Sequence, residues 1–215
     1  MSEHSTFIRT HTTCLEVPLC PEIMLYQSHD ALSIWQSAED RAGKQVPPPY
    51  WAFCWPGGQA LTRYLLDTPE VVRGKKVLDF AAGSGLTAIG AVRAGAASVQ
   101  AAEIDPLAIS AIRLNGATNN VQVGLLEDDI VGQTDAGWDV VVAGDVCYER
   151  PMAERVFSWF SLLVAQGVTV LLADPGRSYL PKHGLKRLAE YTVPTSLDLE
   201  DRLFRETAVF QVLGE

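Results

Sequence analysis

The sequence predicts an α/β fold in which a mostly parallel sheet is covered by helices on both faces. From Val77 onward, short apolar runs alternate with longer helical patterns, as expected for strands joined by crossover helices. The last two strand-like stretches follow each other without a helix, so we expect a hairpin whose last strand runs antiparallel. A chain of 215 residues, 47% of them hydrophobic, is suited to a single soluble domain.

The elements of this core are expected in a regular order. A helix over Gly58 to Leu66 leads into the first strand. Strands are expected at Val77–Phe80, Ser98–Ala102, Val121–Leu126, Asp139–Ala143, Thr169–Ala173, Tyr191–Ser196 and Leu203–Leu213. Helices are expected near Leu86–Ala94, Pro106–Asn119, Met152–Ala165 and Tyr179–Glu190. Pro106 suits the first turn of its helix, where a missing N–H costs nothing.

Residues 1–48 are expected to form an N-terminal extension to a cofactor-binding and catalytic core over residues 49–215, all in one domain. Leu15 to Trp35 alternates weakly and predicts short strands, and Gly43 to Pro49 predicts a loop. Met1 to Thr13 lacks the basic-then-apolar order of a secretory signal. No run approaches the ~20 apolar residues of a membrane span. We therefore expect a cytoplasmic protein without a membrane partner.

The net charge indicates which partners suit the chain, and the cysteine spacing indicates whether a metal site is expected. The formal net charge of -9 argues against non-specific nucleic-acid binding, which needs clustered Lys and Arg, and favours basic partners. The four cysteines have no C-x-x-C spacing, and no histidine stands beside them at zinc-like spacing. We expect reduced, packed thiols and no metal site.

A glycine-rich turn follows the first strand of the core. Asp79 lies near the end of that strand, and Ala81, Gly83 and Gly85 follow it. Glycines allow backbone conformations and close approaches that a side chain would block. The free N–H groups of the helix that starts at Leu86 are expected to face the ligand. The turn therefore predicts binding of a nucleoside-bearing cofactor by Asp79, Ala81, Gly83 and Gly85.

Asp79 distinguishes between two such cofactors. Gly83 to Ala88 also satisfies the dinucleotide fingerprint G-x-G-x-x-G/A, and Glu103 is suitably placed for a ribose. The carboxylate of Asp79, however, would repel a pyrophosphate. S-adenosylmethionine instead carries an ammonium and a sulfonium, which a carboxylate attracts. We therefore expect S-adenosylmethionine as the cofactor, with negligible binding of NAD.

Further acids stand at the ends of successive strands, where ligands of such sheets bind. Glu103 follows the second strand and can accept two hydrogen bonds from ribose hydroxyls. Asp105, two positions on, is more suited to cap the helix that Pro106 begins.

The third strand is followed by two adjacent acids. Asp128 or Asp129 is expected to accept a hydrogen bond from the adenine amino group, and Ile104 or Leu126 to cover the adenine ring. Either acid could instead be a helix cap or a solvated loop residue, and the sequence leaves this open.

The segment Asp145-Val-Cys-Tyr148 follows the fourth strand, where a transferred methyl group would point. Methyl transfer from a sulfonium is an in-line displacement, so a neutral amine must be held against the methyl carbon. Asp145 is predicted to accept a hydrogen bond from that amine and to stabilise the developing cation. Tyr148 is predicted to line the channel or donate a hydrogen bond. The alternative is an acidic cap followed by a packed tyrosine.

Aromatic residues gather upstream, in the segment from Pro49 to Gly58. Indole surface beside a glycine pair can cover an adenine or surround an alkylammonium. We expect Trp55 and Gly58 to contact cofactor or substrate, with a purely structural aromatic cluster as the alternative.

With these motifs, the chain resembles class I S-adenosylmethionine-dependent methyltransferases, and among them the protein lysine methyltransferases with D-x-x-Y after the fourth strand. The closer similarity is to lysine methyltransferases of the electron transfer flavoprotein beta subunit. The segments that carry it are Pro49 to Asp67, Val77 to Ile89, Ala101 to Asn115 and Asp174 to Arg177.

This resemblance implies a Rossmann-like seven-stranded sheet, with cofactor contacts from the Asp79 to Gly85 loop and Glu103. It also implies that a lysine of a protein partner, the electron transfer flavoprotein beta subunit, is methylated near Asp145. Ala81 departs from the pattern, since many members have glycine there, and tightens the turn. The alternatives are a ribosomal-protein methyltransferase, a nicotinamide-like small-amine methyltransferase and a noncatalytic cofactor-binding module.

Overall fold

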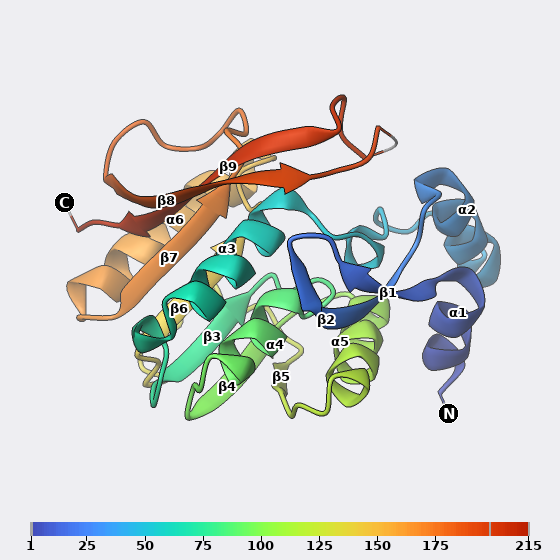
Figure 1. The fold of residues 1–215 in the computed structure, drawn as a ribbon, viewed down its shortest axis with the longest axis horizontal. Coiled ribbons are helices and arrows are strands. Elements are labelled where there is room, and N and C mark those ends of the chain that lie inside the picture. Colours follow the sequence, from blue (N-terminus) through green and yellow to red (C-terminus); the bar gives the residue numbers. More distant parts are fainter. Residues whose placement is uncertain (1, 198, 215) are drawn as a thin grey trace.

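The computed structural model describes residues 2–197 and 199–214, and its core is a seven-stranded sheet in the order β5-β4-β3-β6-β7-β9-β8 (Figure 1). β9 runs antiparallel to both of its neighbours, and the other neighbouring strands are parallel. The expected fold, including the antiparallel last strand, is confirmed. The strands are β3 (Lys76–Phe80), β4 (Ser98–Ala102), β5 (Gly124–Leu126), β6 (Val140–Gly144), β7 (Thr169–Asp174), β8 (Leu185–Pro194) and β9 (Phe204–Val212).

Helices cover both faces of this sheet because successive strand residues point to opposite sides. Val140 and Val142 of β6 pack in the core that α3 and α4 cover, whereas Val141 packs beneath α6. Figure 1 shows α3 and α4 in front of the sheet and α6 behind it. The helices are α3 (Pro56–Asp67), α4 (Leu86–Arg93), α5 (Pro106–Thr118) and α6 (Arg150–Ala165).

One expected helix is wrong. The sequence predicts a helix over Tyr179–Glu190, but β8 begins at Leu185 and pairs with β9. Lys186 and Arg187 are exposed, as is common on a strand that closes one edge of a sheet. Such a strand has no fully buried face, so its sequence lacks the apolar alternation that identifies the inner strands. Pairing with β9 overrides the local helical propensity.

The N-terminal region contains more helix than its sequence predicts. β1 (Thr13–Val17) and β2 (Cys20–Gln27) form the expected short strands, as a separate two-stranded sheet. The expectation of strand up to Trp35 is wrong, because α2 (Ala31–Ala42) begins at Ala31. The Asp30 side chain accepts a hydrogen bond of 2.9 Å from Ser33 N–H, and so caps this helix.

This N-terminal region is fastened to α5. Asn115 of α5 and Asn119, which directly follows that helix, accept hydrogen bonds of 2.9 and 3.0 Å from the backbone of β2. A further helix, α1 (Glu3–His11), which the sequence analysis did not predict, packs beside α2 in an apolar cluster that includes Trp51 of the short helix η1 (Tyr50–Ala52). A second short helix, η2 (Pro69–Val71), follows α3. The extension thereby holds the aromatic segment next to the sheet.

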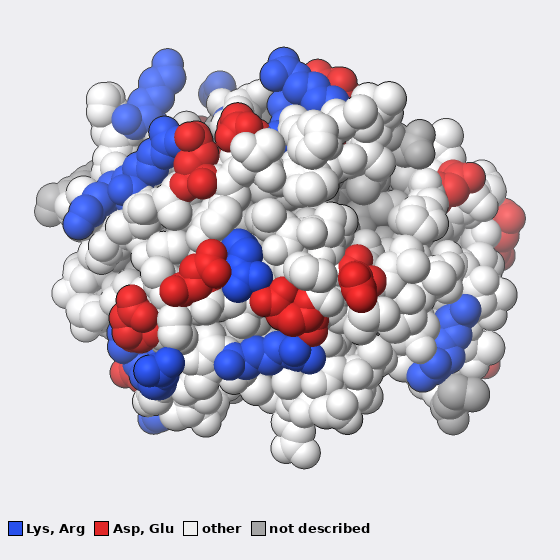
Figure 2. Space-filling model, viewed as in Figure 1, with Lys and Arg blue, Asp and Glu red and all other residues white. Residues whose placement is uncertain are grey.

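On the face shown in Figure 2, basic and acidic side chains are interspersed. Within the described ranges, no helix is long and apolar enough to cross a membrane.

Candidate active site

A cavity of about 980 Å³ lies at the carboxyl edge of the parallel strands. It collects the predicted site residues Trp55, Gly58, Asp79, Ala81, Gly83, Glu103, Ile104, Asp128, Asp129, Asp145 and Tyr148. Gly85 does not line it, and neither does Leu126, the alternative to Ile104 over the adenine ring. Residues from the ends of four strands therefore meet at one place, as the order of acids along the sequence predicts.

The turn after β3 has the backbone conformation that its glycines suggest. Gly83 and Gly85 have φ values of 53° and 78°, in the region that side chains disfavour. Gly85 nevertheless does not line the cavity; it precedes α4, and a Cβ there would lie 3.1 Å from Ile112. Ala81 also has positive φ, 54°, and so occupies a conformation that costs about 1 kcal/mol in a non-glycine residue.

Asp79 is the most deeply buried carboxyl of the cavity wall, with 2% exposure. It accepts a hydrogen bond of 2.8 Å from Ala88 N–H in α4. Burial raises the pKa of Asp79 to about 8, and the negative charge of Glu103 adds to this rise, whereas the hydrogen bond from Ala88 lowers it. The charged form of Asp79 is thus costly unless a cation neutralises it.

Glu103 ties the turn after β3 to the turn after β4. Its Oε2 accepts a hydrogen bond of 2.9 Å from Gly83 N–H, and its Oε1 accepts one of 2.8 Å from Ile104 N–H. Asp105 caps α5 through a 2.8 Å bond from Leu107 N–H, as expected. Ile104 is 67% exposed and offers an apolar surface beside Glu103.

The two acids after β5 differ in their surroundings. Asp129 forms an ion pair of 2.7 Å with Arg155 and accepts a hydrogen bond from Val131 N–H. The hydrogen bond from Arg155 lowers the pKa of Asp129. Asp128 is exposed and lines the cavity with no hydrogen bond to another described residue. Asp128 is therefore the acid of the pair that is free to accept from a ligand.

Asp145 is held from two sides. Its Oδ2 accepts N–H bonds of 2.5 Å from Gly57 and 3.3 Å from Gly58, at the first turn of α3. Its Oδ1 accepts a bond of 3.1 Å from Arg177 Nη2. Because a carboxylate has about four acceptor positions, one position on Oδ1 remains for a ligand. The φ of Asp145 is 55°, and this strained conformation is maintained by those contacts.

Opposing influences set the charge of Asp145. Burial and the negative charge of Asp174 raise its pKa and the Arg177 guanidinium lowers it, and the net result is a pKa of about 6. The carboxylate is therefore ionised at neutral pH but can be protonated in mild acid.

Arg177 lines the cavity and Glu200 pairs with it, and the sequence predicts a site role for neither. Arg177 donates to Glu200 Oε1 at 2.5 Å, and Arg205 donates to Glu200 Oε2 at 2.7 Å. The turn that carries Arg177 is fixed by Asp174, whose Oδ1 accepts from Arg177 N–H at 2.6 Å. The D-P-G-R segment after β7 is the sequence feature that could have identified Arg177. Glu200 lies in a loop distant in the sequence, and no motif there points to a role in the site.

Aromatic rings surround the mouth of the cavity. The ring of Tyr50 lies 5.5 Å from that of Tyr148 and 5.8 Å from that of Trp55, between centroids. Tyr50 and Tyr148 are each 42% exposed, so they are available to a ligand rather than packed in the core. The Arg177 guanidinium lies over the Trp55 ring at 5.8 Å, which shows that this wall accommodates a cation.

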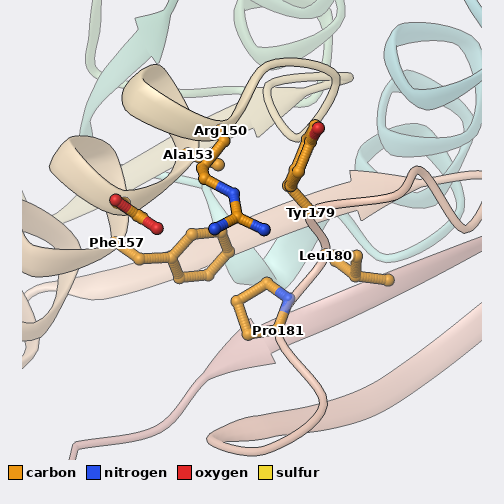
Figure 3. Close-up of a pocket in the computed structure, with 7 residues that line it drawn as sticks. Arg150, Ala153, Phe157, Tyr179, Leu180 and Pro181 are labelled. Carbon is orange, nitrogen blue, oxygen red and sulfur yellow. The ribbon is translucent and has the colours of Figure 1, made fainter.

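A second cavity, of about 360 Å³, lies between α6 and the segment after β7. Figure 3 shows the Arg150 side chain extending between Phe157 and Tyr179, with Pro181 nearby. Its guanidinium lies 5.6 Å from the centre of the Tyr179 ring. This arrangement packs a loop on α6 and brings together none of the predicted site residues.

The four cysteines are free. In the part of the chain that the structure describes, no group of three or more His, Cys, Asp or Glu residues is arranged to hold a metal ion.

The sheet order and the acid-lined cavity define a class I methyltransferase fold, and solved structures agree. A ribosomal protein L11 methylase from Lactobacillus delbrueckii subsp. bulgaricus has a TM-score of 0.53 at 19% identity, covering 76% of this chain and 81% of that one. A putative RNA methyltransferase from Pyrococcus horikoshii has a TM-score of 0.55 at 15% identity, covering 79% and 90%. The family model for ribosomal protein L11 methyltransferase (PrmA) matches residues 59–147.

Curated relatives define the family more narrowly. The electron transfer flavoprotein beta subunit lysine methyltransferase of Danio rerio is 37% identical, covering 90% of this chain and 76% of its own length. That of Xenopus laevis is 36% identical, covering 95% and 85%, and that of Homo sapiens is 39% identical, covering 85% and 71%. This chain belongs to the electron transfer flavoprotein beta subunit lysine methyltransferase family.

Proposed function

We propose that this protein transfers a methyl group from S-adenosylmethionine to a lysine of the electron transfer flavoprotein beta subunit. The observation that carries this proposal is the extent of similarity. Relatives named for that activity match 85–95% of the chain, whereas the ribosomal protein L11 model ends at residue 147, within the cofactor-binding half and before Arg177.

The cavity has groups suited to each part of S-adenosylmethionine. Asp79 is a buried carboxyl that a cation would stabilise in its charged form, so we assign it to the cationic amino-acid end. Glu103 is assigned to the ribose hydroxyls, Asp128 to the adenine amino group, and the exposed Ile104 to the adenine ring. Asp129 is not assigned to the adenine, because Arg155 already pairs with it.

Asp145 is assigned to the substrate amine. When bound, S-adenosylmethionine supplies an electrophilic methyl group. A lysine amine can attack it only as the neutral form, because an ammonium has no lone pair. The free acceptor position on Asp145 Oδ1 can orient the N–H of that amine, and the negative charge of Asp145 stabilises the ammonium that forms as the new N–C bond replaces the C–S bond. Tyr148 and Tyr50 would contact the lysine methylenes at the cavity mouth.

Transfer by Asp145 variants tests this assignment. We expect Asp145→Asn and Asp145→Ala to lower single-turnover methyl transfer by about 100-fold or more, with affinity for S-adenosylhomocysteine within about threefold of wild type. Asp139→Asn, at the opposite end of β6, is the control. Transfer at the wild-type rate, or a loss explained by lost cofactor binding, would show that Asp145 is only a structural cap.

The substrate is tested separately, with labelled S-adenosylmethionine and three acceptors: purified electron transfer flavoprotein, ribosomal protein L11 and nicotinamide. We expect label in the flavoprotein beta subunit, with mass spectrometry locating it on lysine. Label in L11 or nicotinamide alone would replace the proposed substrate, and no label in any acceptor would favour a noncatalytic module.

A further inference from the structure

The described part of the connection between β8 and β9, residues 195–197 and 199–203, together with the first residue of β9, presents several exposed apolar side chains. Leu197, Leu203 and Phe204 are 65%, 57% and 58% exposed. Single exposed apolar residues are common on protein surfaces, but several in one short segment are a mark of an interaction site. We refer to these three side chains as the connection patch.

The connection is anchored on its inner side. Leu199 packs against the apolar cluster that contains Trp51 and Phe53. The Glu200 side chain is 2% exposed and pairs with Arg177 and Arg205. Thr195 N–H donates to Leu203 C=O at 2.9 Å, which closes the loop. The connection patch therefore belongs to a loop fixed at its base, and each of its three side chains is more than half exposed.

The connection is also continuous with the active site. Leu199 and Arg177 line the cavity, and Arg177 links Glu200 to Asp145. Because β9 is antiparallel to β7, the connection that leads into β9 lies at the carboxyl edge of the sheet, where the cavity opens. A protein that inserts a lysine into this cavity would meet the surface around its mouth.

We propose that the connection patch is the docking surface for the folded protein that presents the target lysine. This inference rests on the proposed function and extends it by assigning the surface that binds the protein substrate. A protein with basic side chains around its lysine fits a chain of net charge -9. An anionic membrane is disfavoured by the same charge, and a small amine would need no apolar surface outside the cavity.

The double variant Leu197→Ser/Phe204→Ser tests the proposal. We expect its KM for folded electron transfer flavoprotein to rise at least tenfold, with kcat within twofold of wild type. Transfer to a short lysine peptide from the same substrate and affinity for S-adenosylhomocysteine should be unchanged. Leu162→Ser is the matched control, because Leu162 is 54% exposed on α6 and does not line the cavity.

Each other outcome contradicts a specific statement. An unchanged KM for the folded protein, or an equal loss with the peptide, would overturn the docking surface while leaving the proposed function intact. A wild-type dimer that the double variant converts to a monomer, measured by sedimentation, would assign the patch to a second copy of the chain. Absence of transfer by the wild-type protein to any lysine would overturn the proposed function, and the docking surface with it.

Discussion

Asp79 is expected to release a proton when the cofactor binds, and Asp79→Asn should abolish that release. With a pKa of about 8, Asp79 is about 90% protonated at pH 7. A cationic ligand favours the charged carboxylate, so binding should expel about 0.9 proton per site. Asparagine has no proton to lose, and its amide can still be accommodated near Ala88.

Calorimetry measures this proton directly. S-adenosylhomocysteine is titrated into both proteins at pH 7 in buffers of different ionisation enthalpy, and the slope of observed enthalpy against buffer enthalpy counts protons. Titration of the ligand's own amine contributes to both proteins and cancels in the difference. The wild-type slope should exceed that of Asp79→Asn by about 0.9. Equal slopes would refute the assignment of Asp79 to the cationic end, and Asp139→Asn should behave as wild type.

The same pKa predicts the pH dependence of stability without ligand. The folded-state pKa of Asp79, about 8, lies above the ordinary value of 3.8, so the folded state binds more protons than the unfolded state between these values. The contribution of Asp79 to stability therefore falls as pH rises from about 4 to 8. Asp79→Asn should lack this decline, so the Tm of wild type relative to Asp79→Asn should fall between about pH 4 and pH 8. A Tm difference that stays constant over this range would contradict the raised pKa.

Two comparisons between neighbouring residues give further predictions. A Cβ on Gly57 would lie 2.5 Å from Asp145 Oδ2, whereas a Cβ on Gly58 would lie 3.9 Å from its nearest atom. Gly57→Ala should therefore lower the free energy of unfolding by about 1–3 kcal/mol and abolish methyl transfer, while Gly58→Ala remains folded. Equal melting temperatures for the two variants would contradict this. Asp128→Ala should weaken S-adenosylhomocysteine binding roughly fivefold and Asp129→Ala less than twofold, and calorimetry showing the reverse order would assign the adenine contact to Asp129.

The convergence of the residues that we assign to the cofactor could be predicted from the sequence, because these residues lie in or next to strands that the local pattern identifies. Asp79 and Gly83 lie in one strand and its turn, and alternating strands bring Glu103 to the same edge without further information. The parts that sequence reasoning missed depend on distant segments. Glu200 acquires its role only because β9 inserts beside β7 and brings the loop before it to Arg177.

Local sequence patterns also gave wrong secondary structure where pairing with a distant strand determines the conformation. Leu185 to Glu190 contains good helix formers, but it lies on the outermost strand, where charged side chains are tolerated on both faces. At Ala31 to Trp35 a helix is present where the weak apolar alternation predicted a strand. Two features do indicate this helix: Asp30 is a suitable N-cap, and Ile34 and Ala38 are spaced as on one face of a helix.

Because β9 lies between β7 and β8, the loop before β9 is on the opposite half of the sheet from the residues assigned to the cofactor. The residues that we assign to the nucleoside come from the β3, β4 and β5 side of the sheet, and the wall next to Arg177 comes from the other side. A change in the length or composition of the connection before β9 would thus remodel the entrance without moving Asp79 or Glu103. With the docking role proposed for the connection patch, acceptor specificity would change while the cofactor remains the same, and exchange of this connection between relatives would redirect methylation.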